Sequence, residues 1–267
     1  MACPDCTTGS ILPGEPTGTL STQGAYFTSG LTGEMPSKRA VLLLTDGFGL
    51  PLKNSKILAD NLATCLGCDV WVPDYFEGKP LIALHHLLIP DRAGVKMGVL
   101  DWLKFVLIAV PRVPAFISSR PSVVDARLAK FVAAIQAEKK YEKIGAVGYC
   151  YGGSTAIRLG ATDLVRSIVI CHPGGFTIPE AQAIKVPAAW VCAEDDLFFS
   201  KDLRLKTEAI FGQRKGKDNF IEYEFKDYKG TAHGFAARPN LALPEVKEAH
   251  EKAFEQTVEW FQKTLTI

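Results

Sequence analysis

The residue best placed to do chemistry is a cysteine. Cys150 stands at the centre of G-Y-C-Y-G, residues 148–152, between an apolar run and a helical pattern. This is the pattern of a nucleophile elbow with cysteine in place of serine. A tight strand-to-helix turn strains the backbone of the nucleophile, so Gly148 and Gly152 must be small. The turn would expose the sulfur at a helix N-terminus, where the helix dipole favours the reactive thiolate.

A nucleophile of this kind needs an acid and then a histidine later in the chain. Asp195 and Asp196 follow one predicted strand, and His233 follows the next. We expect His233 to be the general base toward Cys150, with one aspartate orienting its ring through the second nitrogen. Ala193 is a small residue three positions before Asp196, the common spacing in hydrolase turns. We therefore prefer Asp196 and keep Asp195 as the alternative.

Two backbone amides are expected to form an oxyanion hole. One is the N–H after the nucleophile and the other comes from the loop after the third strand. Those positions are Tyr151 and, within D-G-F-G, Gly47. Two convergent amides would stabilise the negative oxygen of a tetrahedral intermediate, and losing one such donor typically costs about 3 kcal/mol in the transition state.

Other interpretations of these residues remain open. The run G-x-C-x-G is also compatible with an ordinary glycine-rich turn that carries a buried cysteine. Cys171 and Cys192 end apolar runs, which indicates core positions. His172 also follows a strand, which would place it at the rim of a pocket, but we favour a structural role for it.

Four further cysteines have C-x-x-C spacing, which invites a zinc or redox interpretation. They are Cys3 with Cys6 and Cys65 with Cys68. The two pairs are much farther apart than in a compact zinc ribbon, so we expect no metal site. A redox protein would also need Cys150 to form a disulfide, and no C-x-x-C includes that residue.

Alternating strands and helices could bring these distant residues together. Strands are expected at 40–45, 70–72, 143–149, 167–171, 188–192 and 220–225, and helices around 58–65, from 122, at 201–211 and from 244. Strands that alternate with helices imply βαβ units and a mostly parallel sheet with helices on both faces. The expected fold class is therefore α/β.

Local patterns suggest where two of the helices begin and end. Leu58, Leu62 and Cys65 share a helical face, and Gly67 stands where a C-terminal cap belongs. Ser122 opens S-V-V-D, a capping-box pattern that predicts a helix start.

Three stretches lie outside this alternation. Residues 75–121 contain five prolines and an interrupted apolar pattern, which predicts a cap-like excursion over the sheet. Residues 19–28 predict an edge hairpin with Gly24 near its turn, and residues 1–17 an N-terminal extension. We see no internal repeat or charge run, so residues 1–267 are expected to form one domain.

Composition excludes several classes of protein. The 267 residues are 47% hydrophobic, and 30 Lys and Arg balance 29 Asp and Glu. Such a chain can bury a core and has no electrostatic footprint for nucleic acid or an anionic membrane surface. It has no apolar run of about 20 residues and no basic region followed by an apolar one at its start. Seven cysteines without a secretory signal favour reduced thiols and a cytoplasmic location.

Together these motifs resemble the dienelactone hydrolase family, whose members are α/β-hydrolases with a Cys-His-Asp triad. The resemblance runs from about residue 40 to the C-terminus. It rests on L-T-D-G-F-G, V-P-D-Y-F-E-G-K-P, G-Y-C-Y-G-G, A-E-D-D-L-F and A-H-G-F-A-A-R. It implies hydrolysis of an enol-lactone or related ester through a cysteinyl thioester, without a cofactor.

The resemblance also implies roles for two charged residues. Family members carry a glutamate after the third strand that helps activate the thiol when substrate binds, and this chain has the shorter Asp46 there. The family uses arginine to hold a substrate carboxylate, and Arg238 is the candidate.

Aromatic residues near strand ends could wall an apolar pocket. They are Tyr75, Phe48 and Phe198, with Trp102 and Phe235.

We therefore expect an ester or lactone hydrolase that acts on a small molecule, with Cys150 as the nucleophile and a carboxylate-bearing compound as one candidate substrate. A thioesterase or acyl transferase would use the same acyl-enzyme. The alternative from another class is a non-catalytic protein of the same fold that binds a small ligand. The shortened carboxylate of Asp46 favours that alternative, and the complete triad opposes it. The oligomeric state cannot be derived from these patterns.

Overall fold

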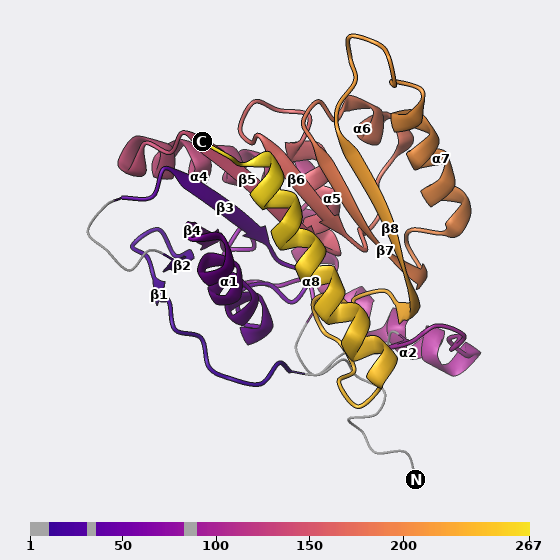
Figure 1. Ribbon diagram of the computed structural model, residues 1–267. Helices are drawn as coiled ribbons and strands as arrows, with labels where there is room; N and C mark the ends of the chain where they lie inside the picture. Colours follow the sequence, from indigo (N-terminus) through magenta and orange to yellow (C-terminus); the bar gives the residue numbers. More distant parts are fainter. Residues whose placement is uncertain (1–10, 31–35, 83–89) are drawn as a thin grey trace.

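A single twisted sheet organises the chain, as the computed structural model shows for residues 11–30, 36–82 and 90–267 (Figure 1). Among the described residues it has eight strands in the order β1-β2-β4-β3-β5-β6-β7-β8. Their bounds are β1 Thr19–Leu20, β2 Tyr26–Ser29, β3 Arg39–Leu44, β4 Asp69–Val72, β5 Lys143–Tyr149, β6 Ser167–Cys171, β7 Ala188–Asp195 and β8 Tyr223–Ala232. Neighbours from β4 to β8 are parallel, whereas β1 and β2 join antiparallel. The predicted mostly parallel sheet is confirmed.

Helices cover both faces of this sheet. Figure 1 shows α1 (Lys53–Leu66) and α8 (Pro244–Thr264) in front of it. The other face carries α4 (Pro121–Lys139), α5 (Tyr151–Leu159), α6 (Ile178–Ala183) and α7 (Lys201–Gly212). Every inner strand is therefore buried on two sides, which explains its continuous apolar sequence.

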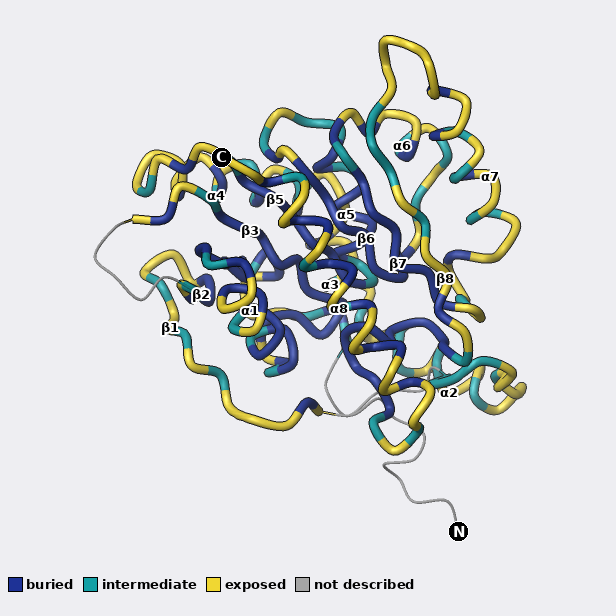
Figure 2. Tube along the Cα trace, viewed as in Figure 1, coloured by how far each residue is buried: buried dark blue, intermediate teal, exposed yellow. Residues whose placement is uncertain are grey.

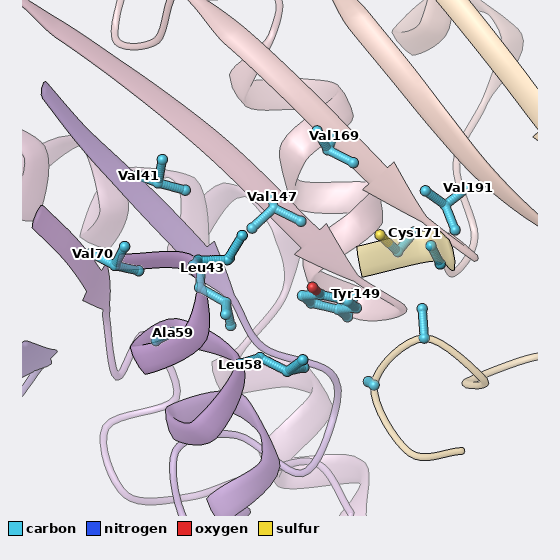
Figure 3. Packing of buried hydrophobic residues seen from close by; sticks show 14 of the residues in the cluster. Val41, Leu43, Leu58, Ala59, Val70, Val147, Tyr149, Val169, Cys171 and Val191 are labelled. Atoms are coloured by element: carbon cyan, nitrogen blue, oxygen red, sulfur yellow. The ribbon is translucent and has the colours of Figure 1, made fainter. Parts of the chain in front are cut away.

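Alternate residues of β3 belong to two separate hydrophobic clusters, one on each face of the sheet. Val41 and Leu43 belong to the cluster under α1 and α8, whereas Leu42 and Leu44 belong to the cluster on the other face. Figure 3 shows this first cluster, with valines of neighbouring strands lying beside one another and Leu58 of α1 facing them. The period of two along a strand thus fixes which side chains pack on which layer of helices.

Two helix predictions need correction. Leu58, Leu62 and Leu66 are among the buried residues of α1, whereas Cys65 is exposed, because a helical face drifts by one position over two turns. The predicted cap at Gly67 is confirmed, since its φ is +56° and its N–H donates to the carbonyl of Ala63.

The capping box predicted at Ser122 is wrong. Helix α4 begins at Pro121, and its N-cap Arg120 makes no side-chain capping hydrogen bond. Proline at the first helical position already has the helical φ and lacks the N–H that a cap would satisfy. Ser122 therefore lies inside the helix.

The edges of the sheet were predicted unequally well. The hairpin is confirmed, with Leu20 opposite Tyr26 and a φ of +75° at Gly24. The last strand was predicted at 220–225, but β8 runs from Tyr223 to Ala232. Its charged residues point to solvent at the sheet edge, so the apolar pattern there is weak.

The predicted excursion contains helices. Within residues 75–121 the chain forms α2 (Val99–Ala109), the 3-10 turn η2 (Val110–Arg112) and α3 (Val113–Ser118), and none of these buries a residue. Figure 2 shows α2 with mostly exposed and intermediate colours near the ends of β7 and β8. Within the part of the chain that the structure describes, no helix combines the length and the apolar character that a membrane crossing requires. That the chain forms one domain stays a prediction.

Candidate active site

Cys150 occupies a sharp turn between β5 and α5. Its backbone has φ +52° and ψ −112°, a conformation that side chains rarely adopt. Its N–H donates to the carbonyl of Cys171 at 3.1 Å, and its own carbonyl accepts from the N–H of Gly174 at 2.8 Å. Two hydrogen bonds to the segment after β6 thus hold the strained residue in place.

The glycines around this turn are required by space. A Cβ on Gly148 would lie 2.0 Å from the carbonyl oxygen of Gly152, and a Cβ on Gly152 would lie 2.1 Å from that of Leu44. Real Cβ atoms do not approach backbone so closely, so neither position accepts a side chain without a shift of the chain. The spacing G-Y-C-Y-G therefore has the geometry expected of a nucleophile elbow.

His233 and Asp196 form a buried pair at the same edge of the sheet. The His233 Nδ1 lies 2.9 Å from Asp196 Oδ1, and their side chains are 1% and 0% exposed. The same carboxylate oxygen accepts the N–H groups of Phe198 and Phe199 at 2.8 and 3.0 Å. Because a carboxylate only accepts, His233 Nδ1 carries the proton and Nε2 is left for proton transfer.

The charges in this cluster favour an imidazolium. Burial lowers the pKa of His233, but the negative charges of Asp196 and Cys150 outweigh it and raise that pKa to about 10. Burial likewise raises the pKa of Asp196, and the charge of His233 more than offsets it, so the net shift is downward. The cluster can therefore hold a thiolate beside a protonated histidine.

Asp195 serves a different part of the molecule. Its Oδ2 accepts the N–H of Gly94 at 2.6 Å. The structure thus brings Asp196, and not Asp195, to His233. The two neighbouring carboxylates divide between the histidine and the segment that precedes α2.

Asp46 and Arg238 are bound to each other. Arg238 Nε donates to Asp46 Oδ2 at 2.8 Å, and both side chains are buried. The second oxygen of Asp46 accepts the N–H of Phe48 at 3.0 Å, and the guanidinium lies over the Phe48 ring at 4.7 Å. In this structure the charge of Arg238 is therefore paired with that of Asp46. The roles expected for these two residues stay predictions.

Of the two amides expected in the oxyanion hole, one lies in the elbow and the other in the loop after β3. Tyr151 is the first residue of α5, so its N–H has no intrahelical acceptor. Gly47 follows β3 in a buried loop, and its carbonyl accepts the N–H of Ile82 at 3.0 Å. The N–H of Gly152 donates to Thr45 at 3.0 Å and ties that loop to the elbow. The arrangement is compatible with an oxyanion hole.

The three aromatic residues expected in the pocket have different positions. Phe198 is 38% exposed, and its ring lies 4.9 Å from that of His233. Tyr75 is buried and its hydroxyl donates to the carbonyl of Thr45 at 2.5 Å. Phe48 is buried beneath Arg238. Only Phe198 therefore stands at the histidine, whereas the other two support loops of the site.

A pocket of about 400 Å³ opens beside the His233–Asp196 pair. Val95, Met97 and Trp102 line it from the segment before and within α2, together with Lys96 as a cation. The sequence patterns did not identify Lys96 or Met97, because both lie in the proline-rich excursion. Their position depends on a distant contact: Asp195, the neighbour of Asp196, accepts a hydrogen bond from the Gly94 N–H and so fixes the backbone just before them.

Within residues 11–30, 36–82 and 90–267, no group of three or more His, Cys, Asp and Glu side chains is arranged so that it could hold a metal ion. Cys3 and Cys6 lie outside the described residues. Cys65 and Cys68 are free thiols, one exposed and one buried. Cys171 and Cys192 are buried in the two core clusters, which confirms the core positions predicted for them.

Comparisons with known proteins agree with this geometry. Hydrolase tropI of Talaromyces stipitatus is 30% identical over 259 residues, covering 97% of this chain and 94% of that protein. Hydrolase pyvD of Aspergillus violaceofuscus is 28% identical over 262 residues, covering 97% and 96%. The crystal structure of dienelactone hydrolase from Anabaena variabilis superposes with a TM-score of 0.59 at 12% identity, covering 94% and 99%, and supports the fold.

The family profile gives the assignment. Residues 29–265 match the profile described as the Dienelactone hydrolase family. The matched residues include the elbow, both aspartates and His233. The chain therefore belongs to the dienelactone hydrolase family and is an α/β-hydrolase-fold enzyme of that family of ester and lactone hydrolases.

Proposed function

We propose that this protein hydrolyses a carboxylic ester or lactone through a cysteinyl acyl-enzyme. The observation that carries the proposal is the buried His233–Asp196 hydrogen bond, 2.9 Å long, beside a strained Cys150. The bond leaves Nε2 of His233 for the nucleophile and the leaving group. The curated relatives named hydrolase support the reaction class.

The first half-reaction forms a thioester. The Cys150 thiolate attacks the ester carbonyl, and the N–H groups of Tyr151 and Gly47 stabilise the negative oxygen that results. As the carbon–oxygen bond breaks, protonated His233 gives its proton to the departing alkoxide. Asp196 keeps the ring oriented and offsets its charge.

The second half-reaction restores the enzyme. Neutral His233 takes a proton from water, and the hydroxide attacks the thioester carbon. Collapse of the intermediate breaks the carbon–sulfur bond and returns the Cys150 thiolate beside protonated His233. A thioesterase or an acyl transferase would share the same acyl-enzyme and differ in the group delivered or accepted.

A carboxylate-bearing substrate fits one feature of the site. Arg238 is bound to Asp46, so a substrate carboxylate can reach its guanidinium only by replacing that partner. The exchange would release the Asp46 carboxylate on the loop next to the elbow. The role of Asp46 in thiol activation is therefore proposed as a consequence of substrate binding.

The proposal is tested by trapping the intermediate. The purified protein is mixed with a small activated ester, and its intact mass is measured within the first turnovers. We expect an acyl adduct that is absent in Cys150→Ala and present in Cys65→Ala, the matched control at an exposed free cysteine. Turnover that persists unchanged in Cys150→Ala would reject the nucleophile, and binding without turnover would favour the non-catalytic alternative.

A further inference from the structure

A second histidine lies directly against the proposed base. His172 follows β6 with a φ of +33°, and its side chain is fully buried. Neither ring nitrogen has a hydrogen-bond partner among the described residues. Buried polar atoms are almost always paired, so two unpaired nitrogens on one buried ring need an explanation.

The contacts of this ring lead to the active site. Its centroid lies 5.1 Å from that of His233 at an interplanar angle of 71°, and 5.8 Å from that of Phe235. The residues around His172 also hold the elbow, because Cys171 and Gly174 make the two hydrogen bonds to the Cys150 backbone. One short segment therefore touches both the proposed nucleophile and the proposed base.

The surroundings keep His172 neutral. Burial is the main cause that lowers its pKa well below the ordinary value, and the positive charge of His233 acts in the same direction. Of the other charged groups that face it, Arg238 also lowers this pKa, and Asp196 opposes the change. Tyr149 of β5 packs against the ring from the sheet. A neutral imidazole thus stands beside a charged one.

We propose that His172 is a positioning residue, a neutral polar ring that fixes the His233 imidazole and supports its charged form. A phenyl ring could fill the same space without burying two unpaired nitrogens. An imidazole, however, has a permanent dipole and ring nitrogens that can be turned toward the charges of an adjacent buried ion pair, and a phenyl ring has neither. The inference rests on the proposed function, in which Cys150 and His233 form that pair.

The left-handed backbone offers a competing explanation. Histidine and asparagine adopt positive φ more readily than most residues, so the position could require only that conformation. The two explanations separate in His172→Asn, which keeps the backbone preference and removes the ring. They also separate in His172→Phe, which keeps the ring and removes its polar atoms.

The test is the pH dependence of alkylation of Cys150 by iodoacetamide, measured by peptide mass spectrometry together with the melting temperature. In His172→Phe we expect the acid limb of the rate to move to higher pH by roughly one pH unit, because the ion pair loses its polar neighbour. In His172→Asn we expect alkylation at neutral pH to slow about tenfold, because the ring that orients His233 is lost. His250→Phe is the matched control, since His250 is also buried with an unpaired Nδ1 but lies against the backbone of Phe235, and its limb should not move.

The outcomes separate the two proposals. If wild-type Cys150 is alkylated only in the ordinary pH range of a free thiol, the resting ion pair is absent and the role of His172 fails, whereas the proposed function is judged separately by the acyl adduct on Cys150. If the wild-type limb is low but His172→Phe leaves it in place, the role of His172 fails and the proposed function stands. Wild-type behaviour of His172→Asn would show that the position requires only the backbone conformation.

Discussion

Two neighbouring regions of this protein are built in opposite ways. The carboxyl edge of the sheet, where Cys150, Asp196 and His233 lie, consists of buried side chains with short hydrogen bonds. The cap, defined as residues 99–118 with α2, η2 and α3, buries none of its side chains, and Val99 and Leu107 are 86% and 64% exposed. In the first region packing and hydrogen bonds hold the side chains of His233 and Asp196, with a pocket open on one side. The second is supported mainly by its own helical hydrogen bonds.

A short segment before the cap connects the two regions. Gly94 donates to Asp195 at 2.6 Å, and Ala93 donates to the carbonyl of Gly230 at 3.1 Å. Asp91 accepts from Asn240 at 2.6 Å. These bonds anchor the segment to the same loops that carry Asp196 and His233. The chemistry of the site and the shape of its pocket are therefore set by different parts of the molecule that share one attachment.

The largest effect on kcat is expected at two adjacent aspartates: Asp196 binds His233, and Asp195 binds the segment before the cap. Asp196→Asn should lower kcat by about 10³–10⁴, because an amide no longer selects the His233 tautomer that leaves Nε2 free. Asp195→Asn weakens only the hydrogen bond from the Gly94 N–H, because an amide oxygen accepts less strongly than a carboxylate, and should change kcat by less than about threefold while raising KM as the pocket wall loosens. Steady-state kinetics on one activated ester measures both.

The two aspartate variants can also contradict the division between the sheet edge and the cap. Equal losses of kcat in the two variants would mean that the cap attachment takes part in the chemistry. Circular dichroism and the melting temperature of each variant show whether a loss reflects misfolding.

The next effect concerns the buried Asp46–Arg238 pair. Removing one partner leaves a buried charge without its counterpart, so Asp46→Asn and Arg238→Met should each lower the free energy of unfolding by about 3–5 kcal/mol. The double variant should lose clearly less than the sum, because no unpaired charge remains. Urea denaturation measures the cycle, and additive losses would contradict the pairing.

Asp46→Asn has a second readout. If Asp46 activates the thiol, acylation of Cys150 should slow in this variant while the fold persists at low denaturant. Equal acylation rates would show that His233 activates the thiol without it.

The same contrast explains what the sequence could predict. The inner strands were placed within a residue or two because both of their faces are buried, apart from the end of β7, which continues three residues beyond the predicted Cys192 to Asp195. The elbow followed from glycines at fixed spacing. The order of acid and histidine then led to Asp196 and His233. These features depend on local backbone geometry, which residue types encode directly.

The remainder depends on contacts between distant segments. No local pattern shows that Arg238 is bound to Asp46, because 192 residues separate them. The pocket residues Lys96 and Met97 are placed by a hydrogen bond from Gly94 to Asp195, 101 residues away. The helices of the cap were missed because prolines interrupt the apolar pattern of this stretch, and its apolar residues are exposed and not gathered on one buried face.

A smaller effect is a pH dependence of stability that only the sheet edge should show. The pKa of His233 is raised to about 10 in the folded chain, against about 6.5 in an unfolded one. Its contribution to stability is therefore fully present below about pH 6.5 and is lost as the pH rises through about 10. Between these values the free energy of unfolding of the wild type should fall relative to that of His233→Gln.

Urea denaturation at several pH values measures this difference. Lys104→Gln in the cap is the control, and its difference from the wild type should stay constant over the range below about pH 9, where a lysine remains charged. A constant difference for His233→Gln as well would mean that the histidine is not held in its charged form.

The smallest effects are expected in the cap itself. Leu103→Gln and Leu107→Gln change side chains that are 55% and 64% exposed, so each should alter the free energy of unfolding by less than about 0.5 kcal/mol. Their kinetics on a small activated ester should match the wild type. Trp102→Gln provides the contrast, because Trp102 also lines the pocket beside His233 and should raise KM for an apolar ester several-fold without changing kcat. A loss of stability of about 2 kcal/mol in Leu103→Gln or Leu107→Gln would mean that the cap packs against another surface in solution, and the contrast between the two regions would then hold only for the isolated chain.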